Sequence, residues 1–183
     1  MLYYFDAGRV VSPALTPYKR MFISKITDID ALALRLRDLK ATGKRIVFTN
    51  GCFDILHVGH IDLFRNAKRL GDVLIVAINS DQSVRRIKGD KRPIFDEVER
   101  AEILSALEMV DFVTVFGEDT PLETILKVRP DILVKGADWE DKGIVGQYEV
   151  EGWGGKVVPM SLIEGRSTSG IIDRIVSVTR PAG

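Results

Sequence analysis

The sequence is poor in the residues that several classes of protein require. Its 183 residues include one cysteine and two histidines, which excludes an internal disulfide and a cysteine-based zinc site. A single cysteine suits a reducing compartment, so we expect a cytoplasmic protein. The 26 basic residues equal the 26 acidic ones, so no net charge attracts nucleic acid or an anionic membrane as a partner. No apolar run approaches the roughly 18 residues of a membrane span, and the N-terminus lacks the features of a signal peptide.

The chain is predicted to form one domain preceded by an arm. Hydrophobic residues make up 45% of the sequence and charged residues 28%, which is ordinary for a globular domain. Residues 1–22 contain two prolines and no clear periodicity, so we predict an irregular arm that packs on the body or on a neighbouring subunit. Residues 23–183 are enough for a single domain with a sizeable core.

Apolar runs and amphipathic segments alternate along this domain. Nearly continuous apolar strands that alternate with helices indicate a parallel sheet covered on both faces. The predicted fold class is therefore α/β, a Rossmann-like, doubly wound sheet of about five parallel strands. The predicted strands are 45–50, 72–79, 111–116, 131–136 and 155–160, and the helices lie within 26–45, 60–71, 95–110, 120–130 and 167–178. Thr27 or Asp28 is the expected N-cap of the first helix and Thr120 that of the fourth.

Ligands of such sheets bind beyond the carboxyl ends of the strands. Both histidines lie there, in the H-x-G-H pattern of His57, Gly59 and His60, which follows the predicted strand 45–50 and Gly51. A glycine permits close backbone approach, and a helix N-terminus offers N–H groups and a positive dipole to an anion. Two imidazoles can donate to the same phosphate oxygens. The alternative is one core histidine and one surface histidine, but the pairing at a strand-to-helix turn favours a nucleotide phosphate site.

Positive charge is concentrated after the second strand. The stretch "RRIKGDKRPI" begins at Arg85, in a chain that is otherwise neutral. A flexible loop that closes over a triphosphate or a sugar phosphate would use several such donors, whereas the alternative is a solvated surface loop. Lys88 and Arg92 are the predicted contacts.

Three further groups follow strands or open the last helix. Asn79 and Asp81 can form the floor of a pocket, and "KGADWE" (135–140) is placed to contact a nucleoside or an acceptor. "STS" (167–169) can hold phosphates at a helix start, although N-capping alone also explains these hydroxyls. The alternative for Trp139 in "KGADWE" is a purely structural role.

Several stretches together carry a family resemblance. "GCFDILHVGH" resembles the first signature of the nucleotidyltransferase superfamily that carries an H-x-G-H motif. "VAINSDQSVRRIKGDKRPI", "ERAEILSALEMVDFV", "PDILVKGADW" and "EGRSTSGIIDRI" resemble, in order, the adenylyltransferase domain that makes ADP-heptose. The resemblance covers roughly residues 44–178. Related glycerol-phosphate cytidylyltransferases carry an Arg-Thr pair upstream of the last motif, and "PMSLIEG" lacks that arginine.

The resemblance implies a reaction. It implies transfer of AMP from ATP to a sugar 1-phosphate, D-glycero-β-D-manno-heptose 1-phosphate, with release of pyrophosphate, in lipopolysaccharide biosynthesis. It further implies Mg²⁺ bound with ATP and held by phosphates rather than by protein ligands, and we predict a homodimer. The alternatives are cytidylyl or adenylyl transfer to glycerol 3-phosphate, phosphoethanolamine or FMN, and a nucleotide-binding regulatory module without activity.

The site residues predicted from the motifs and the resemblance fall into three roles. The catalytic residues are His57, His60 and Lys88. The nucleotide-binding residues are Asn50, Gly51, Cys52, Phe53, Asp54, Gly59, Arg100, Lys135, Gly136, Ser167, Thr168 and Ser169. The substrate-binding residues are Asn79, Asp81, Arg92, Asp138 and Trp139. Cys52 shows no arrangement that would activate a nucleophile.

Overall fold

The computed structural model describes residues 5–6, 9–10, 25–136, 143–161, 163, 165 and 167–179. The predicted arm, residues 1–22, lies mostly outside this part of the chain. Within it the structure describes β1 (Phe5–Asp6) and β2 (Arg9–Val10), which pair antiparallel. The boundary between the arm and the domain stays a prediction. None of the helices in the described ranges is both long and apolar enough to cross a bilayer.

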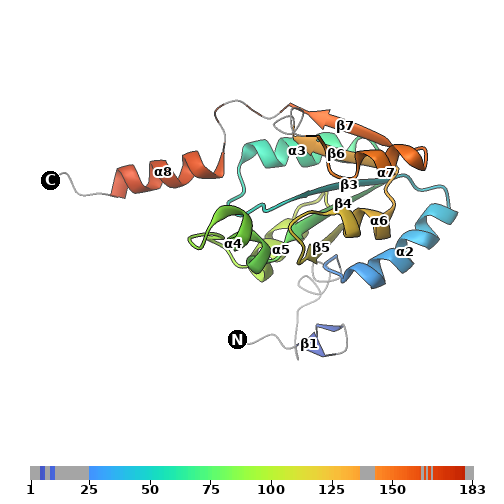
Figure 1. Cartoon of the computed structure of the whole chain (residues 1–183), viewed down its shortest axis with the longest axis horizontal. Helices are drawn as coiled ribbons and strands as arrows, with labels where there is room; N and C mark the ends of the chain where they lie inside the picture. The colour runs from blue at the N-terminus through green and yellow to red at the C-terminus, as the bar shows by residue number, and fades with distance from the viewer. Residues whose placement is uncertain are drawn as a thin grey trace.

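A five-stranded parallel sheet forms the centre of the molecule (Figure 1). The strand order is β5-β4-β3-β6-β7, and every neighbouring pair is parallel. The chain therefore begins at the central strand, builds outward to one edge, and then returns to build the other edge. This confirms the predicted α/β class, and the switch point lies between β3 and β6. The strands are β3 (Ile46–Gly51), β4 (Val73–Asn79), β5 (Phe112–Phe116), β6 (Ile132–Gly136) and β7 (Lys156–Met160).

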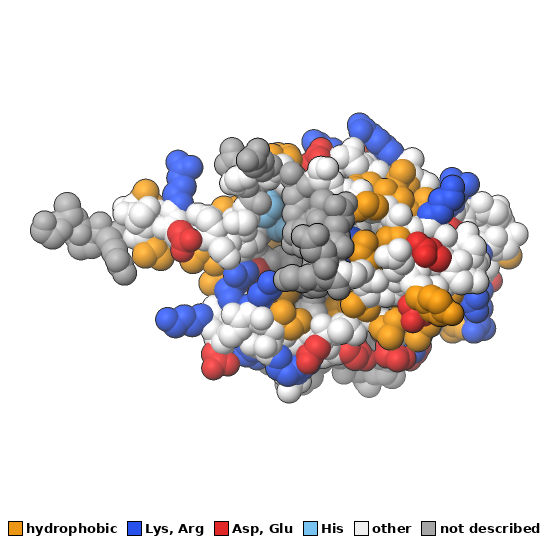
Figure 2. All heavy atoms as spheres, turned by 45° about the horizontal axis from the view of Figure 1, so that its top comes forward, with side chains coloured by type: hydrophobic (Ala, Val, Ile, Leu, Met, Phe, Trp, Pro, Cys, Tyr) orange, Lys and Arg blue, Asp and Glu red, His pale blue; other side chains and the backbone are white. Residues whose placement is uncertain are grey.

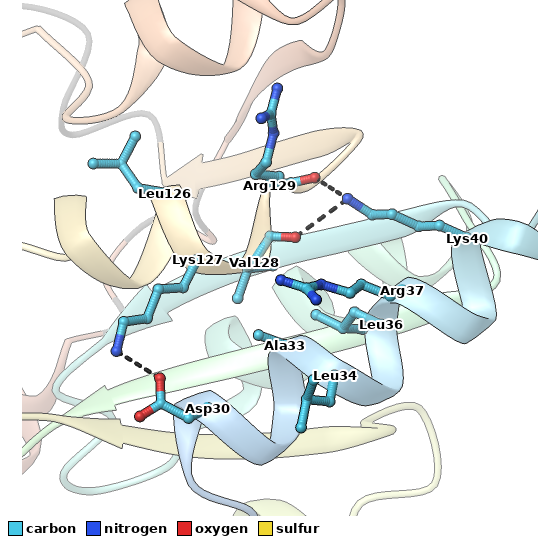
Figure 3. A pocket seen from close by; sticks show the side chains of 10 residues that line it. All are labelled: Asp30, Ala33, Leu34, Leu36, Arg37, Lys40, Leu126, Lys127, Val128 and Arg129. Atoms are coloured by element: carbon cyan, nitrogen blue, oxygen red, sulfur yellow. Dashed lines mark hydrogen bonds and ion pairs between the residues drawn. The ribbon is translucent and has the colours of Figure 1, made fainter.

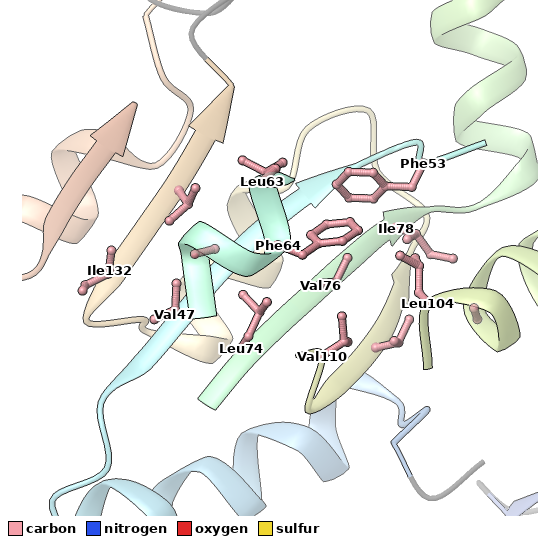
Figure 4. Close-up of a cluster of buried hydrophobic side chains, with 14 residues drawn as sticks. Val47, Phe53, Leu63, Phe64, Leu74, Val76, Ile78, Leu104, Val110 and Ile132 are labelled. Carbon is pink, nitrogen blue, oxygen red and sulfur yellow. The ribbon is translucent and has the colours of Figure 1, made fainter. Parts of the chain in front are cut away.

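Helices cover both faces of the sheet because successive residues of each strand point to opposite sides. In β4, Leu74, Val76 and Ile78 join one apolar cluster, shown in Figure 4, to which α3 and α5 contribute. Alternate residues such as Ile75 join a second cluster with α2, α6 and α7. The helices are α2 (Ile29–Ala41), α3 (Val58–Lys68), α4 (Asp81–Lys88), α5 (Glu97–Ser105), α6 (Leu122–Val128), α7 (Gln147–Gly152) and α8 (Thr168–Thr179).

Two local predictions need correction. Thr120 is not the N-cap of α6, since Pro121 takes that position and no side chain caps the helix. The predicted basic loop is a helix over its first half, because α4 continues through Lys88 and ends at Gly89, whose φ is 90°. The expected cap of the first helix is confirmed: the carboxylate of Asp28 accepts hydrogen bonds from two backbone N–H groups of α2.

The last helix stands apart from the sheet. Figure 1 shows α8 extending away from the body, and none of its residues is buried. Its apolar side chains are accordingly exposed, with Ile175 at 50% and Val178 at 73% of their accessible surface. Only the start of α8 lies near the sheet, close to the turn that follows β3.

Candidate nucleotide-binding site

The turn between β3 and α3 has an open helix N-terminus. His57 is the N-cap residue of α3, with extended backbone angles, but no side chain caps the helix and its first turn holds no acidic residue. The neighbouring α4 and α5 differ, because Ser80 and Asp96 accept hydrogen bonds from their first N–H groups. The positive end of α3 is therefore available to an anion, as the H-x-G-H pattern predicts.

The two imidazoles form one unit at this helix start. The rings of His57 and His60 stack with their centroids 3.7 Å apart and an interplanar angle of 24°. Burial, with a smaller contribution from the charge of His57, lowers the pKa of His60 to about 4, so this ring is neutral at neutral pH. Its Nδ1 is buried and has no hydrogen-bond partner among the described residues. A buried polar atom of this kind is a natural contact for a ligand.

Phe53 holds His60 from the other side. Its ring meets the His60 ring edge-on, with the centroids 5.2 Å apart. The centroid of the Phe64 ring lies 5.0 Å from that of Phe53 (Figure 4). The Phe53 backbone has φ 43°, a left-handed conformation that is uncommon for a bulky residue. A Cβ added to Gly51 would lie 3.1 Å from the Phe53 ring. Because the Phe53 side chain is 7% exposed, it supports the imidazole from the core side. The predicted nucleotide contact of Phe53 stays a prediction.

Asp54 binds the far end of the basic segment. Its carboxylate accepts hydrogen bonds from Ile94 N (2.8 Å), Phe95 N (2.9 Å) and Arg92 Nε (2.6 Å). Burial acts to raise the pKa of Asp54, but these hydrogen bonds and the Arg92 charge outweigh burial, so the pKa is lowered. In this arrangement Arg92 contacts protein, and its predicted contact with substrate stays a prediction.

Arg100 lies beneath the site as a buried brace. Its guanidinium donates to Phe95 O (3.0 Å), Cys52 O (2.7 Å) and Asp81 Oδ1 (2.7 Å), and the side chain is fully buried. It thus ties together the histidine turn, the start of α4 and the start of α5. Arg100 is therefore not part of an exposed ion-pair pattern on α5, because these contacts lie inside the molecule. Its predicted contact with nucleotide stays a prediction.

The floor residues after β3 and β4 are hydrogen-bonded to one another. Asn79 is buried and donates from Nδ2 to Ser83 Oγ at 3.0 Å, and its Oδ1 lies 3.8 Å from Cys52 Sγ. Burial raises the pKa of the Cys52 thiol, which keeps it protonated at neutral pH. This agrees with the expectation that Cys52 is not an activated nucleophile, and its predicted contact with nucleotide stays a prediction. The Asp81 backbone N–H donates to Glu97 at 2.8 Å, which fixes the start of α4.

The other predicted residues converge on the same end of the sheet. Lys135, at the end of β6, donates through Nζ to Asn50 Oδ1 at the end of β3, across the switch point. Gly136 is the last residue of β6, and Asp138 and Trp139, which follow it, lie outside the described residues. Lys88 ends α4, and its charge acts on the Cys52 thiol, which counteracts part of the effect of burial on the pKa of Cys52. Figure 2 shows lysine and arginine side chains on the same face of the molecule as the exposed histidine atoms.

The hydroxyl motif lies beside the histidine turn. Thr168 Oγ1 donates to Ile55 O at 3.4 Å, which attaches the start of α8 to the residues just before His57. Ser167 Oγ accepts from Gly170 N at 3.1 Å, so its hydroxyl acts as a helix cap in this structure. The capping explanation therefore holds for Ser167, and the predicted phosphate roles of Ser167, Thr168 and Ser169 stay predictions.

A separate groove lies between α2 and α6 (Figure 3). It has a volume of about 640 Å³ and is lined by apolar residues with basic residues at its rim. Lys40 donates to the carbonyls of Val128 and Arg129, and Lys127 pairs with Asp30 at 2.7 Å. None of the predicted site residues that the structure describes lines this groove, so it is not the site that the motifs indicate.

The described residues do not form a protein cage for a metal. No three histidine, cysteine, aspartate or glutamate side chains gather in this part of the chain in a way that could hold an ion. Asp54, the buried carboxylate nearest the histidine turn in sequence, is occupied by its hydrogen bonds to residues 92–95. A divalent ion at this site would take its ligands from phosphate oxygens and water.

Comparison with known proteins gives one consistent family. Residues 48–174 match the family model described as cytidylyltransferase-like. The chain is 53% identical over 153 residues to the "Bifunctional protein HldE" of Geobacter metallireducens, a match that covers 84% of this chain and 31% of that protein. The protein of the same name from Syntrophotalea carbinolica is 50% identical over 163 residues, covering 89% and 33%. The chain thus spans about a third of the length of these curated relatives.

Solved structures agree with this. The lipopolysaccharide core biosynthesis protein from Thermoplasma volcanium matches with a TM-score of 0.55 and 33% identity, over 68% of this chain and all of that one. A pantoate-beta-alanine ligase from Francisella tularensis has a TM-score of 0.56 at 21% identity, covering 79% and 68%, and shows a shared fold only. With the matched region covering most of the described sheet and the histidine turn, the chain belongs to the cytidylyltransferase-like family of nucleotidyltransferases.

Proposed function

We propose that this chain transfers AMP from ATP to D-glycero-β-D-manno-heptose 1-phosphate, forming ADP-heptose and releasing pyrophosphate. The observation that carries the reaction type is the stacked pair of His57 and His60 at the uncapped N-terminus of α3. The choice of acceptor is supported by the ordered motifs and by the identity to relatives named HldE.

The proposed reaction is a direct displacement. An oxygen of the sugar 1-phosphate attacks the α-phosphorus of ATP, a new P–O bond forms, and the bond from the α-phosphorus to the bridging oxygen breaks. The electron pair leaves with pyrophosphate, and no covalent intermediate with the protein is needed. Catalysis then comes from positioning and from stabilisation of the negative charge on the transferring group.

His60 would act as a neutral hydrogen-bond donor. A ring with a pKa of about 4 carries no charge at pH 7, so the one N–H of His60 can donate a hydrogen bond to a phosphate oxygen. The helix dipole of α3 adds positive potential at the same place. Lys88 is proposed to approach the phosphates from the end of α4. Mg²⁺ bound to the triphosphate would neutralise part of its charge.

The proposed nucleotide and acceptor contacts occupy the two sides of this turn. Asn50, Gly59, Lys135 and Gly136 are proposed for the nucleotide, and the hydroxyls of "STS" (167–169) for its outer phosphates. Asn79, Asp81 and the residues Asp138 and Trp139 are proposed for the acceptor. We further propose a cytoplasmic homodimer with neither nucleic acid nor membrane as a partner. The exposed apolar side chains of α8 support a contact between subunits.

A pyrophosphate-release assay tests the function. The protein is incubated with Mg²⁺, with ATP or CTP, and with each of the acceptors heptose 1-phosphate, glycerol 3-phosphate, phosphoethanolamine and FMN. The proposal expects release only with ATP and heptose 1-phosphate. Turnover with CTP and glycerol 3-phosphate instead would favour the second candidate, which the family description cytidylyltransferase-like keeps in view. A folded protein without turnover on any pair would indicate a regulatory module.

A further inference from the structure

Asp54 connects two parts of the site that are far apart in the sequence. It lies three residues before His57, and its side chain is 1% exposed. All the hydrogen bonds recorded for its carboxylate come from one stretch, residues 92–95, about forty positions further along the chain. The histidine turn and the end of the basic segment are therefore joined through one buried carboxylate.

Arg100 provides a second buried connection between Phe95 and the histidine turn. The Phe95 N–H donates to Asp54 at 2.9 Å, and the Phe95 carbonyl accepts from Arg100 Nε at 3.0 Å. Arg100 in turn donates to Cys52 O at 2.7 Å, in the same turn as Asp54. The backbone N–H of Phe95 is thus bound to the histidine turn directly, and its backbone carbonyl is bound to that turn through Arg100.

The stretch before this anchor is exposed and carries free charge. Residues 85–91 are all exposed, and Gly89, with φ 90°, separates α4 from the turn that follows. Arg86 pairs with Asp119 at 2.6 Å, but no ion pair is recorded for Arg85, Lys88 or Lys91 within the described part of the chain. The carboxyl end of the basic segment is therefore held at the histidine turn, and Lys88 and Lys91 lie within a few residues of that anchor in the chain.

We propose that Asp54 is a positioning residue, which holds the basic segment in register with the histidine turn, and that Arg92 acts through Asp54 and not as a ligand of substrate. The proposal rests on the proposed function for its kinetic readout. It differs from the prediction made from sequence, in which Arg92 contacts the acceptor. The contacts that hold the basic segment join Asp54 to Arg92 and to the backbone N–H groups of Ile94 and Phe95.

A double-mutant cycle tests this. Asp54→Asn and Arg92→Gln each break the carboxylate–guanidinium contact, so each should lower kcat/KM by about 100-fold, the loss expected when catalytic groups shift by about an ångström. If Arg92 acts only through Asp54, the double variant should lose no more than the worse single variant. Losses that multiply would show that Arg92 contacts substrate by itself and would overturn the proposal.

Amide hydrogen exchange supplies a readout that does not depend on turnover. In Asp54→Asn the N–H groups of Ile94 and Phe95 should exchange about tenfold faster or more, since a buried charge-assisted acceptor is lost. The matched control is Asp111→Asn, because the Asp111 carboxylate also accepts from a lysine, Lys68, and from a backbone N–H, Leu74 N. That control should leave kcat/KM and the exchange of Ile94 and Phe95 unchanged.

The outcomes separate the two proposals. Faster exchange in Asp54→Asn with normal kcat/KM would overturn the positioning role while leaving the proposed function intact. If the wild-type protein releases no pyrophosphate, the proposed function fails, and the same cycle is read in the Kd for ATP with Mg²⁺, where the same pattern of non-additive losses is expected. If Asp54→Asn does not fold, Arg92→Lys is compared with Arg92→Gln, and partial rescue by lysine supports the charge pairing, whereas no rescue of the exchange rates contradicts it.

Discussion

The two ends of the parallel sheet differ in whether the polar groups described below have a hydrogen-bond partner within the protein. At the amino ends, Asp72, Asp111 and Asp131 precede β4, β5 and β6. Each carboxylate accepts a hydrogen bond from a backbone N–H group at the start of the neighbouring strand or just before it. The donors are Arg45 N (2.8 Å), Leu74 N (2.6 Å) and Ile46 N (2.7 Å). At the carboxyl ends, α3 begins without a side-chain cap and the buried Nδ1 of His60 has no protein partner in the described ranges.

This difference suggests that the polar groups at the amino ends contribute to stability and those at the start of α3 to ligand binding. Polar groups that form hydrogen bonds with one another stabilise the fold. A buried donor or acceptor without a partner lowers the stability of the fold unless a ligand forms the missing hydrogen bond. Asp111 illustrates the point, because it lies in "ERAEILSALEMVDFV", one of the stretches that carry the family resemblance. The structure puts it at the amino end, paired with Lys68, where it closes the sheet.

Replacing His60 by alanine should give the largest effect on activity. Loss of one preorganised donor at the transferring phosphate is expected to lower kcat by about 100- to 1,000-fold. The free energy of unfolding should change by less than about 1 kcal/mol, because the ring is partly exposed and lies at the surface of the core. Steady-state kinetics and urea unfolding check this, and a folded variant with near-normal kcat would remove His60 from the mechanism.

Replacing Asp131 by alanine should do the opposite. The variant leaves Ile46 N without its acceptor, which is expected to cost about 1–3 kcal/mol of stability. The corresponding fall in Tm is roughly 2–10 °C for a domain of this size. Below the new Tm, kcat should stay within about twofold of the wild-type value. A selective loss of kcat without a fall in Tm would contradict the division between the two ends.

Gly51→Ala tests the support of the histidine pair. Its new Cβ would lie 3.1 Å from the Phe53 ring, and that ring contacts His60, so the imidazole should shift. We expect kcat to fall by about 10- to 100-fold with a stability loss near 1 kcal/mol. Gly152→Ala is the matched control, since nothing lies within 4 Å of its Cβ position, and it should leave kcat unchanged.

The pH dependence of the free energy of unfolding should report the protonation of His60. Its pKa is about 4 in the folded chain against 6.5 for a free histidine, so between these values the unfolded state binds more protons. The free energy of unfolding should therefore rise from pH 4 to pH 6.5, and less steeply in His60→Gln. Urea unfolding at pH 4.5, 5.5 and 7 measures the difference, and identical slopes in both proteins would show that His60 is not held neutral.

The fold was largely predictable because its signals are local. Each strand is a short apolar run, and the five predicted strands match β3 to β7 within a residue or so. The short helix α7 was missed, since Gln147–Gly152 has only six residues, with one of them, Val150, in the core. Asp96 and Glu99 form a capping box, a pattern in the sequence that marks where α5 begins.

The site was predictable as a set of residues but not as a set of contacts. The H-x-G-H pattern places two histidines at one helix start, whatever surrounds them. The bond of Arg100 to Cys52 O spans 48 residues and that of Arg92 to Asp54 spans 38, and no periodicity reports such pairs. The left-handed Phe53 gives no signal either, since nothing in its neighbours requires a positive φ.

A crystal structure with α,β-methylene ATP and Mg²⁺ tests the central claim most directly. The account predicts that the triphosphate lies at the N-terminus of α3, with the α-phosphate within hydrogen-bond distance of His57 and His60 and the base beside the ends of β3 and β6. A triphosphate bound elsewhere, such as in the groove between α2 and α6, with both imidazoles unchanged, would contradict it.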